Sequence, residues 1–594
     1  MTNKKTETRN KFDVDEYLSE DISLFNIKRC LVYLKRVKWS FLSALVISLV
    51  GNVAALTGPL FIQRALDVAI PAKDYALLFR MALFLALSIV VSIALGTVRN
   101  VIVARAGQNV IHDIRADLFS HLQKLAFSFY DGRPHGKIFV RVVPYVNNVS
   151  DALSNGILNF ILEILNIVFI IFFMYQVDVK LATVTVCGLP LLAAFILFIK
   201  PRQRRAWQDV SNKNANINAY IQESIDGIKV TQAFDRQRRN LATIDRLQNE
   251  RNKAWMRAIY ISNTVWFSTE TISQIVYSFI YIAGAFWMNP MASFGVLLVM
   301  ANYAWRFWQP IINLGNIYNT FITAFAYLDR VFDAIAEEVT IKDAPDALDY
   351  TMMRGHVEFK NVCFSYDGKK QILRNINLDA HPGLTLAIVG PTGAGKTTIV
   401  NLLSRFYNIE DGLVTIDGQD VMKIKLSALR SQMGIMLQDN FLFTGTIADN
   451  IRYGKLDATD AEVQKAAELI GAHHFIEKLP DGYNTRVSER GGGISSGERQ
   501  LLAFARTILC NPRILILDEA TSSIDTSTEQ LVQEGIKKMM AGRTSFIIAH
   551  RLSTIRDCDK ILYIDGGQIT EQGTHAELMA LQGAYYRLYN SQAG

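Results

Sequence analysis

Long apolar segments fill the first half of the chain, whereas short apolar runs alternate with amphipathic helical patterns in the second half. Six of the long segments approach the roughly 20 residues that a helix needs to cross the hydrocarbon core of a bilayer. They cover residues 39–62, 77–98, 157–177, 180–200, 260–288 and 291–313. The pattern therefore predicts an all-α membrane domain with six transmembrane helices, of which the fourth and sixth have the least sharply marked ends.

Positive charge is distributed unevenly around these segments. Residues 99–141 and 200–257 are long, helical in pattern and rich in Lys and Arg, whereas the links near Pro71, 176–179 and 289–290 are short and carry little positive charge. Because cytoplasmic loops carry the excess of Lys and Arg, we expect both long stretches and both termini in the cytoplasm. We also expect the second and third helices, and the fourth and fifth, to continue beyond the membrane, the alternative being surface helices without partners.

The patterns divide the chain into four parts. Residues 1–23 form a polar tail without the pattern of a cleaved signal peptide. Residues 24–336 form the transmembrane domain, which opens with an amphipathic elbow helix at 24–38 that could lie along the headgroups or be an ordinary solvated helix. A polar linker follows at 337–354, and alternating strands and helices at 355–594 predict an α/β domain with a mixed sheet.

Composition adds two limits to this picture. The 62 Lys and Arg only modestly exceed the 55 Asp and Glu, and in the first half the basic residues bracket apolar segments, which favours a membrane protein over a nucleic-acid binder. The five cysteines are scattered without C-x-x-C spacing, so they predict neither a disulfide framework nor a metal site.

A glycine-rich loop in the second half lies between an apolar strand pattern at 384–389 and a helical pattern at 398–407. Its residues fit G-x-x-x-x-G-K-[ST] and are Gly390, Pro391, Thr392, Gly393, Ala394, Gly395, Lys396, Thr397 and Thr398. Glycines let backbone N–H groups close around phosphate oxygens at a helix N-terminus. We therefore predict a nucleotide site, with Lys396 on the outer phosphates and Thr397 on Mg²⁺.

A pair of carboxylates, Asp518 and Glu519, ends the apolar strand pattern at 514–517. An apolar strand followed by acidic residues is common and on its own is weak evidence for a site. In a chain that also has a phosphate loop, it becomes a strong candidate for the magnesium and catalytic carboxylates. Such a strand would bring Asp518 near Mg²⁺, and Glu519 could accept a proton from the attacking water.

Further motifs follow in the same half of the chain. They are Gln438 within residues 436–440, Ile494-Ser495-Ser496-Gly497-Glu498, Ser522-Ser523-Ile524-Asp525 and Ala549-His550-Arg551. With the phosphate loop and the carboxylate pair, this set resembles the ATP-binding cassette (ABC) family, specifically exporter half-transporters. The resemblance runs from about residue 24 to the end and implies a membrane all-α domain fused to an α/β P-loop ABC nucleotide-binding domain.

The resemblance also implies roles for single residues, with ATP and Mg²⁺ as cofactors. Tyr366 resembles the aromatic residue that stacks on adenine. Gln438 resembles the residue that touches Mg²⁺ and the attacking water. Glu519 resembles the catalytic base, and His550 the histidine on the γ-phosphate. Asp525 resembles the residue that communicates across the dimer, and Glu489 belongs to a loop like the one that meets the membrane helices in exporters.

The signature motif departs from the family pattern Leu-Ser-Gly-Gly-Gln. Ser495 and Gly497 are kept, whereas Ser496 replaces a glycine, which we expect to restrict a positive φ and crowd the phosphate. Glu498 replaces glutamine and adds negative charge near a negative ligand. In the family each ATP lies between one chain's loop and the partner's signature, so a single chain cannot complete a site. We favour a heterodimer with one degenerate site; a homodimer that tolerates Ser496 is the alternative.

The substrate is much less legible. Glu163 and Glu270 are carboxylates in apolar spans, which makes them candidates for a substrate cavity, and Arg306 beside Trp305 could pair with one of them. Such a site would suit an amphipathic drug-like or lipid-like molecule. Packing aromatics and structural charge pairs are an equally good explanation.

Other classes of protein fit the chain less well. A soluble ABC ATPase would lack the spans, and a P-loop kinase or GTPase would lack the signature. The remaining rival is an ABC protein that gates or senses rather than pumps. For the exporter and for this rival the plasma membrane is the simplest location, with an organelle as the alternative.

Overall fold

The computed structural model describes Arg29 and residues 32–131, 138–139, 141–151, 156–287, 292–350, 352–436, 441–488, 492–518, 526–548 and 552–593. The chain forms two compact units that are not contiguous in sequence. One consists of Met1–Leu122 and Gly136–Ala336, and the other of Gln123–His135 and Glu337–Gly594. Each unit is described by itself.

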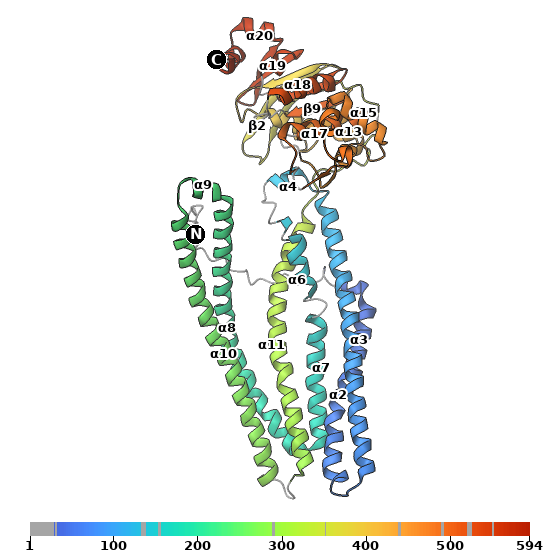
Figure 1. The fold of residues 1–594 in the computed structure, drawn as a ribbon, viewed down its shortest axis with the longest axis vertical. Helices are drawn as coiled ribbons and strands as arrows, with labels where there is room; N and C mark the ends of the chain where they lie inside the picture. The colour runs from blue at the N-terminus through green and yellow to red at the C-terminus, as the bar shows by residue number, and fades with distance from the viewer. Residues whose placement is uncertain are drawn as a thin grey trace. The chain divides into compact units, whose positions relative to one another are not determined.

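The first unit is all-α (Figure 1). Its long helices are α2 (Lys38–Arg64), α3 (Tyr75–Leu122), α7 (Ile157–Val177), α8 (Val179–Asp226), α10 (Gln237–Ile282) and α11 (Phe294–Ala336). Shorter helical pieces are η1 (Ala65–Ala69), η2 (Arg141–Tyr145), α6 (Val146–Asp151), α9 (Ile228–Ala233) and η4 (Ala283–Trp287). The predicted spans fall on these six long helices, apart from the ends at 288 and 291, which lie outside the described residues.

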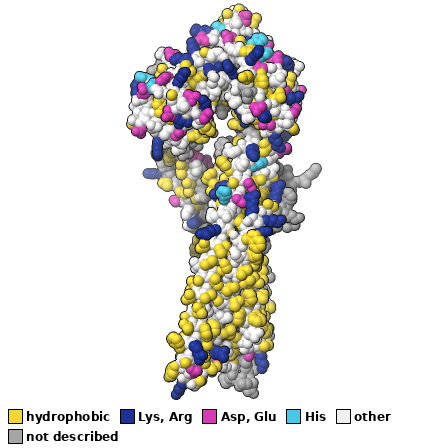
Figure 2. Space-filling view, turned by 90° about the vertical axis from the view of Figure 1, so that its right-hand side faces the viewer, with side chains coloured by type: hydrophobic (Ala, Val, Ile, Leu, Met, Phe, Trp, Pro, Cys, Tyr) yellow, Lys and Arg dark blue, Asp and Glu magenta, His cyan; other side chains and the backbone are white. Residues whose placement is uncertain are grey.

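A membrane environment explains the surface of this unit. Side chains such as Phe79 (71% exposed), Val90 and Ile93 face outward, and Figure 2 shows hydrophobic side chains covering a broad band of the helices. Among the described residues, Lys38–Ala69, Tyr75–Leu122 and Ile157–Val177 are long and apolar enough to cross a bilayer, and Val179–Gly188 is a shorter apolar stretch. The count of six crossings therefore remains a prediction.

The basic stretches predicted to extend beyond the membrane are helical. α3 continues without a break to Leu122, and α8 and α10 run side by side, joined through α9 (Figure 1). Trp207 of α8 packs edge-on against Trp255 of α10 at 5.3 Å between ring centroids, and its Nε1 donates to Ser262 Oγ at 3.0 Å. The extension of α8 is thus paired with that of α10, so the alternative of unpartnered surface helices is wrong there.

The segment before α2 contacts α3 through polar groups. Tyr33 donates from its hydroxyl to Asp117 at 2.9 Å, and Arg36 forms an ion pair with Asp113 at 2.8 Å. The described part of the predicted elbow helix is therefore fixed against the charged end of α3.

The second unit is α/β, as predicted. Its strands are β1 (Val357–Ser365), β2 (Gln371–Ala380), β3 (Thr385–Val389), β4 (Asp411–Ile416), β5 (Gln419–Asp420), β6 (Met433–Met436), β7 (Gly445–Thr446), β8 (Arg486–Val487), β9 (Ile514–Asp518), β10 (Thr544–Ile548), β11 (Lys560–Asp565) and β12 (Gln568–Gly573). An antiparallel sheet has the order β2-β1-β4-β5, and β7 pairs with β8. The larger sheet, β12-β11-β3-β10-β9-β6, is parallel except for β12.

Helices surround these sheets in Figure 1. They are α4 (Phe127–Asp131), α12 (Lys396–Leu403), η5 (Val421–Lys423), α13 (Leu426–Ser431), α14 (Ile447–Arg452), α15 (Asp460–Ile470), α16 (His473–Ile476), η6 (Gly482–Asn484), α17 (Ser496–Leu509), α18 (Thr526–Met540), α19 (Leu552–Arg556), α20 (His575–Leu581) and α21 (Ala584–Ala593). Two hydrophobic cores lie on opposite faces of the larger sheet, because Leu515 belongs to one and Ile516 to the other. Burial on both faces explains the apolar runs at residues 386–389 in β3 and 514–517 in β9.

The predicted linker at 337–354 is bonded to the second unit. Leu348 exchanges backbone hydrogen bonds with Lys423 and Lys425 at 2.8 and 3.0 Å. The buried guanidinium of Arg405 donates to Lys342 O at 2.6 Å and to Ile424 O at 2.9 Å. Arg405 therefore ties the start of this segment to the sheet region.

The same unit includes a short helix from the first half of the chain. The ring of Phe127 in α4 lies 4.9 Å from that of Phe406, and the Tyr407 hydroxyl donates to the Asp131 carboxylate. Sequence reasoning placed residues 123–135 in the membrane domain and did not anticipate this contact. A signal in the sequence was the aromatic pair Phe406-Tyr407, at the end of the helical pattern that follows the phosphate loop.

Candidate nucleotide site

The site is organised by three neighbouring parallel strands. β10 lies between β3 and β9, with Ile548 opposite both Ile388 and Asp518. The carboxyl ends of these strands therefore meet at one edge of the sheet, where ligands of open α/β sheets bind. Gly390, the first residue of the phosphate loop, follows Ile388 by two positions. Gly390 and Asp518 therefore lie at the same edge of the sheet, at the ends of the two strands that flank β10.

The loop has a shape that requires glycine. Gly390 has φ 145°, and a Cβ there would lie 2.0 Å from the carbonyl oxygen of Ile564. Gly395 has φ 104°, and a Cβ would lie 2.7 Å from a side-chain carbon of Leu373. α12 begins at the next residue, Lys396, so the loop leads directly into a helix N-terminus, where backbone N–H groups are available to an anion. This cradle fits the phosphates of a nucleotide.

Lys396 lies at the centre of the loop, only 8% exposed. Its Nζ donates to the carbonyl oxygens of Gly390 and Pro391 at 2.8 and 3.0 Å. Burial lowers the pKa of the Lys396 ammonium from its ordinary value, and the charge of Asp518 opposes that change. Asp518 is thus close enough for electrostatic coupling to Lys396, which places the predicted phosphate ligand and the predicted magnesium ligand in one site.

The rest of the loop presents an open edge. Pro391, Thr392, Gly393 and Thr397 are exposed, whereas Ala394 and Thr398 are buried beneath them. The exposed Thr397 is available to a ligand, as the prediction of a magnesium-binding hydroxyl requires.

Tyr366 lies beside α12 and is 46% exposed. Its hydroxyl is 3.0 Å from Thr398 Oγ1, and its ring makes edge contacts with Phe364 at 5.0 Å and Tyr407 at 4.9 Å between centroids. These contacts hold a half-exposed aromatic ring next to the phosphate loop, which suits the predicted stacking on adenine.

The signature motif forms the N-terminus of α17. Ser495 is the N-cap: its Oγ accepts from the N–H of Glu498 at 3.2 Å, while the Glu498 carboxylate accepts from the N–H of Ser495 at 2.8 Å. This is a capping box, in which both side chains satisfy backbone donors at the helix start. Glu498 therefore fixes a negative charge at the end of α17 that would otherwise attract an anion.

The expectation that Ser496 strains a positive φ is wrong. Ser496 is the first residue of α17 and does not have the positive φ that the argument required, because its backbone is already helical. Gly497 is buried and Ser495 and Ser496 are exposed. The substitutions that remain relevant to a phosphate are thus the added serine side chain and the charge of Glu498.

Several predicted site residues lie outside the described part of the chain. Gln438, Glu519, Asp525, His550 and the loop residue Glu489 are among them. β6 ends at Met436, two positions before Gln438. β9 ends at Asp518, one position before Glu519, and β10 ends at Ile548, two positions before His550. Their roles stay predictions.

The predicted membrane charges do not pair as suggested. Arg306 Nη1 donates to the Ala55 carbonyl oxygen of α2 at 2.9 Å, so its hydrogen bond goes to the backbone of a neighbouring helix rather than to either carboxylate. Glu163 accepts from Asn313 Nδ2 at 2.7 Å, which joins α7 to α11, and Glu270 accepts from Gln274 on its own helix at 2.9 Å.

Two further residues belong to this region of the membrane helices, and the role of Trp305 in a substrate cavity stays a prediction. Asn313 was missed, although an amide within an apolar helix is a signal for a polar partner. Trp305 is 59% exposed and stacks on Tyr277 with 6.4 Å between ring centroids.

Comparison with known proteins decides the family. Residues 41–310 match the model of the ABC transporter transmembrane region, and residues 373–522 match the ABC transporter model. The protein YgaD of Bacillus subtilis, named for multidrug export, is 35% identical over 580 residues, which is 95% of this chain and 99% of YgaD. The chain belongs to the ABC transporter family.

Two further relatives of this ABC transporter are informative. The fatty acid ABC transporter ATP-binding/permease protein of Mycobacterium tuberculosis is 38% identical over 483 residues, covering 81% of this chain and 76% of that protein. The structure of a bacterial Atm1-family ABC exporter with ATP bound matches with a TM-score of 0.79 and 28% identity, over 94% of this chain and 99% of that one. The predicted fold, a transmembrane all-α domain fused to an ABC nucleotide-binding domain, is confirmed.

These findings also establish the general activity of the ABC transporter. It is an ATP-binding membrane protein of the exporter type, with ATPase activity coupled to transport. The phosphate loop, with Lys396 and Asp518 at one edge of the sheet, remains the predicted place of nucleotide binding.

Proposed function

We propose that this chain is one subunit of a heterodimeric exporter in the plasma membrane, which uses ATP to move an amphipathic drug-like or lipid-like molecule outward. The observation that supports a heterodimer is an asymmetry within the chain. The phosphate loop carries the glycines and the buried Lys396 that a nucleotide site needs, whereas the signature helix begins with the capping carboxylate of Glu498. This difference supports an active half-site on this chain's loop and a weakened half-site on its signature.

In this proposal the half-site built on this chain's phosphate loop hydrolyses ATP opposite the partner's signature. The loop N–H groups and Lys396 hold the phosphates, and Thr397, Asp518 and Gln438 hold Mg²⁺, which supplies charge neutralisation for phosphoryl transfer. Glu519 accepts the proton of the attacking water, His550 contacts the γ-phosphate, and Asp525 communicates across the dimer. Tyr366 supports the adenine ring. Ser495 and Gly497 face the partner's ATP, with Ser496 and Glu498 weakening that second site.

Coupling to transport requires a contact between the ATPase and the membrane helices. α4, with Phe127 on Phe406 and Asp131 on Tyr407, belongs to the ATPase unit although its sequence lies between two membrane segments. Movement of the unit on ATP binding therefore moves residues 123–135, which are covalently continuous with α3. ATP binding then favours the outward-facing state, and hydrolysis resets it.

Evidence on the substrate comes from the membrane helices and the relatives. Glu163 with Asn313 provides a polar pair between α7 and α11, and Trp305 with Tyr277 provides an aromatic pair. An amphipathic molecule suits such a mixture. One relative is named for multidrug export and another for fatty acids. Fatty acids are amphipathic lipids.

The subunit composition of the complex, extracted gently from its native membrane and weighed by native mass spectrometry, tests the proposal. Two different chains in equal amounts are expected. A single chain at twice its mass would contradict the heterodimer and leave a homodimer with two equivalent sites.

A flux assay tests the export function. In vesicles containing the complex, efflux of a fluorescent amphiphile is expected to stop when Glu519→Gln abolishes hydrolysis. Flux that continued without hydrolysis would favour an ATP-gated or sensing protein.

A further inference from the structure

A group of three potential metal ligands lies at one end of the antiparallel sheet, in β1, β2 and the residues that flank them. In the register of this pair Val357 faces Ala380 and Glu358 faces Asp379, so the next pair outward is His356 and His381. Val357 and Ala380 are buried. Because side chains alternate across a sheet, the pairs on either side of them project to the opposite, solvent-facing side. The fold thus gathers His356, Asp379 and His381 on one surface.

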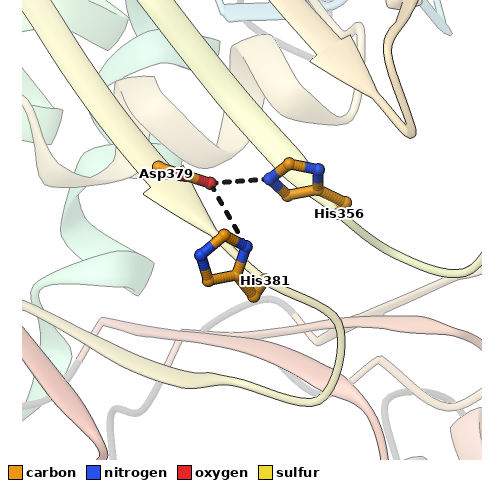
Figure 3. Close-up of side chains that lie close together, drawn as sticks. All are labelled: His356, Asp379 and His381. Atoms are coloured by element: carbon orange, nitrogen blue, oxygen red, sulfur yellow. Dashed lines mark hydrogen bonds and ion pairs between the residues drawn. The ribbon is translucent and has the colours of Figure 1, made fainter.

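The three side chains point toward one another (Figure 3). Asp379 Oδ1 is 2.7 Å from His356 Nε2 and 3.8 Å from His381 Nδ1. The two imidazole rings are 5.1 Å apart between centroids, and the ligand atoms all lie within 4.8 Å of one another. Two nitrogens and one oxygen therefore converge on a common point.

These distances are compatible with a shared ion. Zinc binds His nitrogen and carboxylate oxygen at about 2.0–2.2 Å, which in a tetrahedron separates neighbouring ligand atoms by about 3.4 Å. The observed 2.7 and 3.8 Å lie on either side of that value. The side chains of His381 and Asp379 are 72% and 52% exposed, so shifts of less than an ångström meet little resistance from packing.

The carboxylate is suited to ligation. Asp379 Oδ1 lies between the two imidazoles, 2.7 Å from His356 Nε2 and 3.8 Å from His381 Nδ1, so one carboxylate oxygen can share an ion with both rings. Lys560 also lies near this carboxylate. The positive charge of Lys560 works against a cation, which limits the affinity that we expect.

We propose that His356, Asp379 and His381 form a binding site for a divalent transition metal ion of the zinc type, with water completing its coordination. Two imidazoles and a carboxylate suit Zn²⁺, Cu²⁺ or Ni²⁺ better than Mg²⁺ or Ca²⁺, which prefer oxygen ligands. Three ligands on an exposed surface make an exchangeable site rather than a permanent structural one. The site is separate in sequence and in sheet from the predicted magnesium ligands.

The backbone around the site is already fixed. Asp417 accepts from the N–H of His356 at 2.8 Å, and Thr544 Oγ1 donates to Gly355 O at 2.7 Å and accepts from Gly383 N at 3.0 Å. These bonds hold the residues beside both histidines, which preorganises the ligands. A bound ion would join the start of β1 to the turn that leads into β3, the strand that carries the phosphate loop.

Metal titration of the full-length protein tests this site. The protein is purified in detergent with an affinity tag that contains no histidine, stripped with a chelator and titrated with Zn²⁺ by calorimetry. We expect a site that His356→Asn, Asp379→Asn and His381→Asn each weaken at least tenfold, since even residues that merely support metal ligands contribute ten- to a hundredfold. His474→Asn, at an exposed histidine of α16, is the matched control and is expected to leave binding unchanged.

The identity of the ligands is tested by electron paramagnetic resonance with one equivalent of Cu²⁺. Hyperfine coupling to two imidazole nitrogens is expected in the unaltered protein, and to one in His381→Asn. Because the His381 side chain is largely exposed, this variant folds normally, which its thermal unfolding without metal verifies. Zinc affinity and copper spectra that did not change in the His356 and His381 variants would overturn the proposal.

Discussion

Ser495 provides a test that separates a structural role from contact with ATP. Its capping box has a close counterpart in the same unit: Thr459 caps α15 with Glu462 in the same way. Replacing an N-cap hydroxyl residue by alanine costs about 1 kcal/mol, within a range of about 0.5–2. Ser495→Ala and Thr459→Ala should therefore lower the melting temperature of this unit by a similar amount, about 2–4 °C.

The two variants are then compared in ATPase activity of the native complex, corrected for the folded fraction. A lost hydrogen bond to a charged phosphate is worth about 1.5–3 kcal/mol, which is roughly a tenfold to hundredfold effect on turnover. If the signature faces the slow site of a heterodimer, Ser495→Ala should resemble Thr459→Ala, and turnover should change less than about threefold. Lys396→Ala, in the chain's own loop, should abolish turnover.

One result would refute this reasoning. Suppose that Ser495→Ala loses as much ATP turnover as Lys396→Ala while its melting temperature equals that of Thr459→Ala. That result would place Ser495 at a site that hydrolyses ATP. The chain would then be expected to act as a homodimer, and the Glu498 carboxylate would not weaken the ATP site that it faces.

Two further variants test the geometry of the second unit. Gly390→Ala places a Cβ 2.0 Å from the Ile564 carbonyl oxygen at a φ of 145°, so we expect loss of binding of a fluorescent ATP analogue. Gly393→Ala strains a φ of 81° but meets no atom within 4 Å, so it should weaken binding less; equal affinities would contradict the loop geometry. Arg405→Leu leaves the carbonyl oxygens of Ile424 and Lys342 without their donor and should destabilise the unit by about 1–3 kcal/mol in denaturant unfolding. The control Lys425→Ala, which breaks an exposed ion pair, should cost less than about 1 kcal/mol, and an equally small effect of Arg405→Leu would show that its buried bonds are dispensable.

The nucleotide site could be predicted from sequence because its signals are local. Gly390, Gly395 and Lys396 sit at fixed spacing between a strand and a helix, and the physical reason for each residue type is contained in that short segment. The apolar runs of β3 and β9 likewise reveal strands buried on both faces. Adjacency of Asp518 to the loop then follows from parallel strand order, although the sequence does not show that β10 lies between them.

Features that depend on distant register were missed. His356 and His381 are 25 positions apart, and their meeting depends on the pairing of β1 with β2, which a sequence pattern leaves open. The prediction for Ser496 failed for a different reason: the position of the helix start was not known, so a glycine preference was assigned to a residue with helical backbone. Arg306 was assigned a carboxylate partner because the sequence cannot show that the Ala55 carbonyl is nearer.

The contact between α4 and the aromatic pair has a consequence for biosynthesis. Asp131 precedes Tyr407 by 276 residues. At about 5–20 residues per second, the ribosome needs about 15–55 s to make the surface on which α4 rests. During that time α4 has left the ribosome without its counterpart, while the next membrane segments are inserted. The contact between α4 and Phe406-Tyr407 therefore forms late, after the membrane segments are inserted. In truncated chains that end before Phe406, α4 would lack this contact and would be exposed to quality-control proteases.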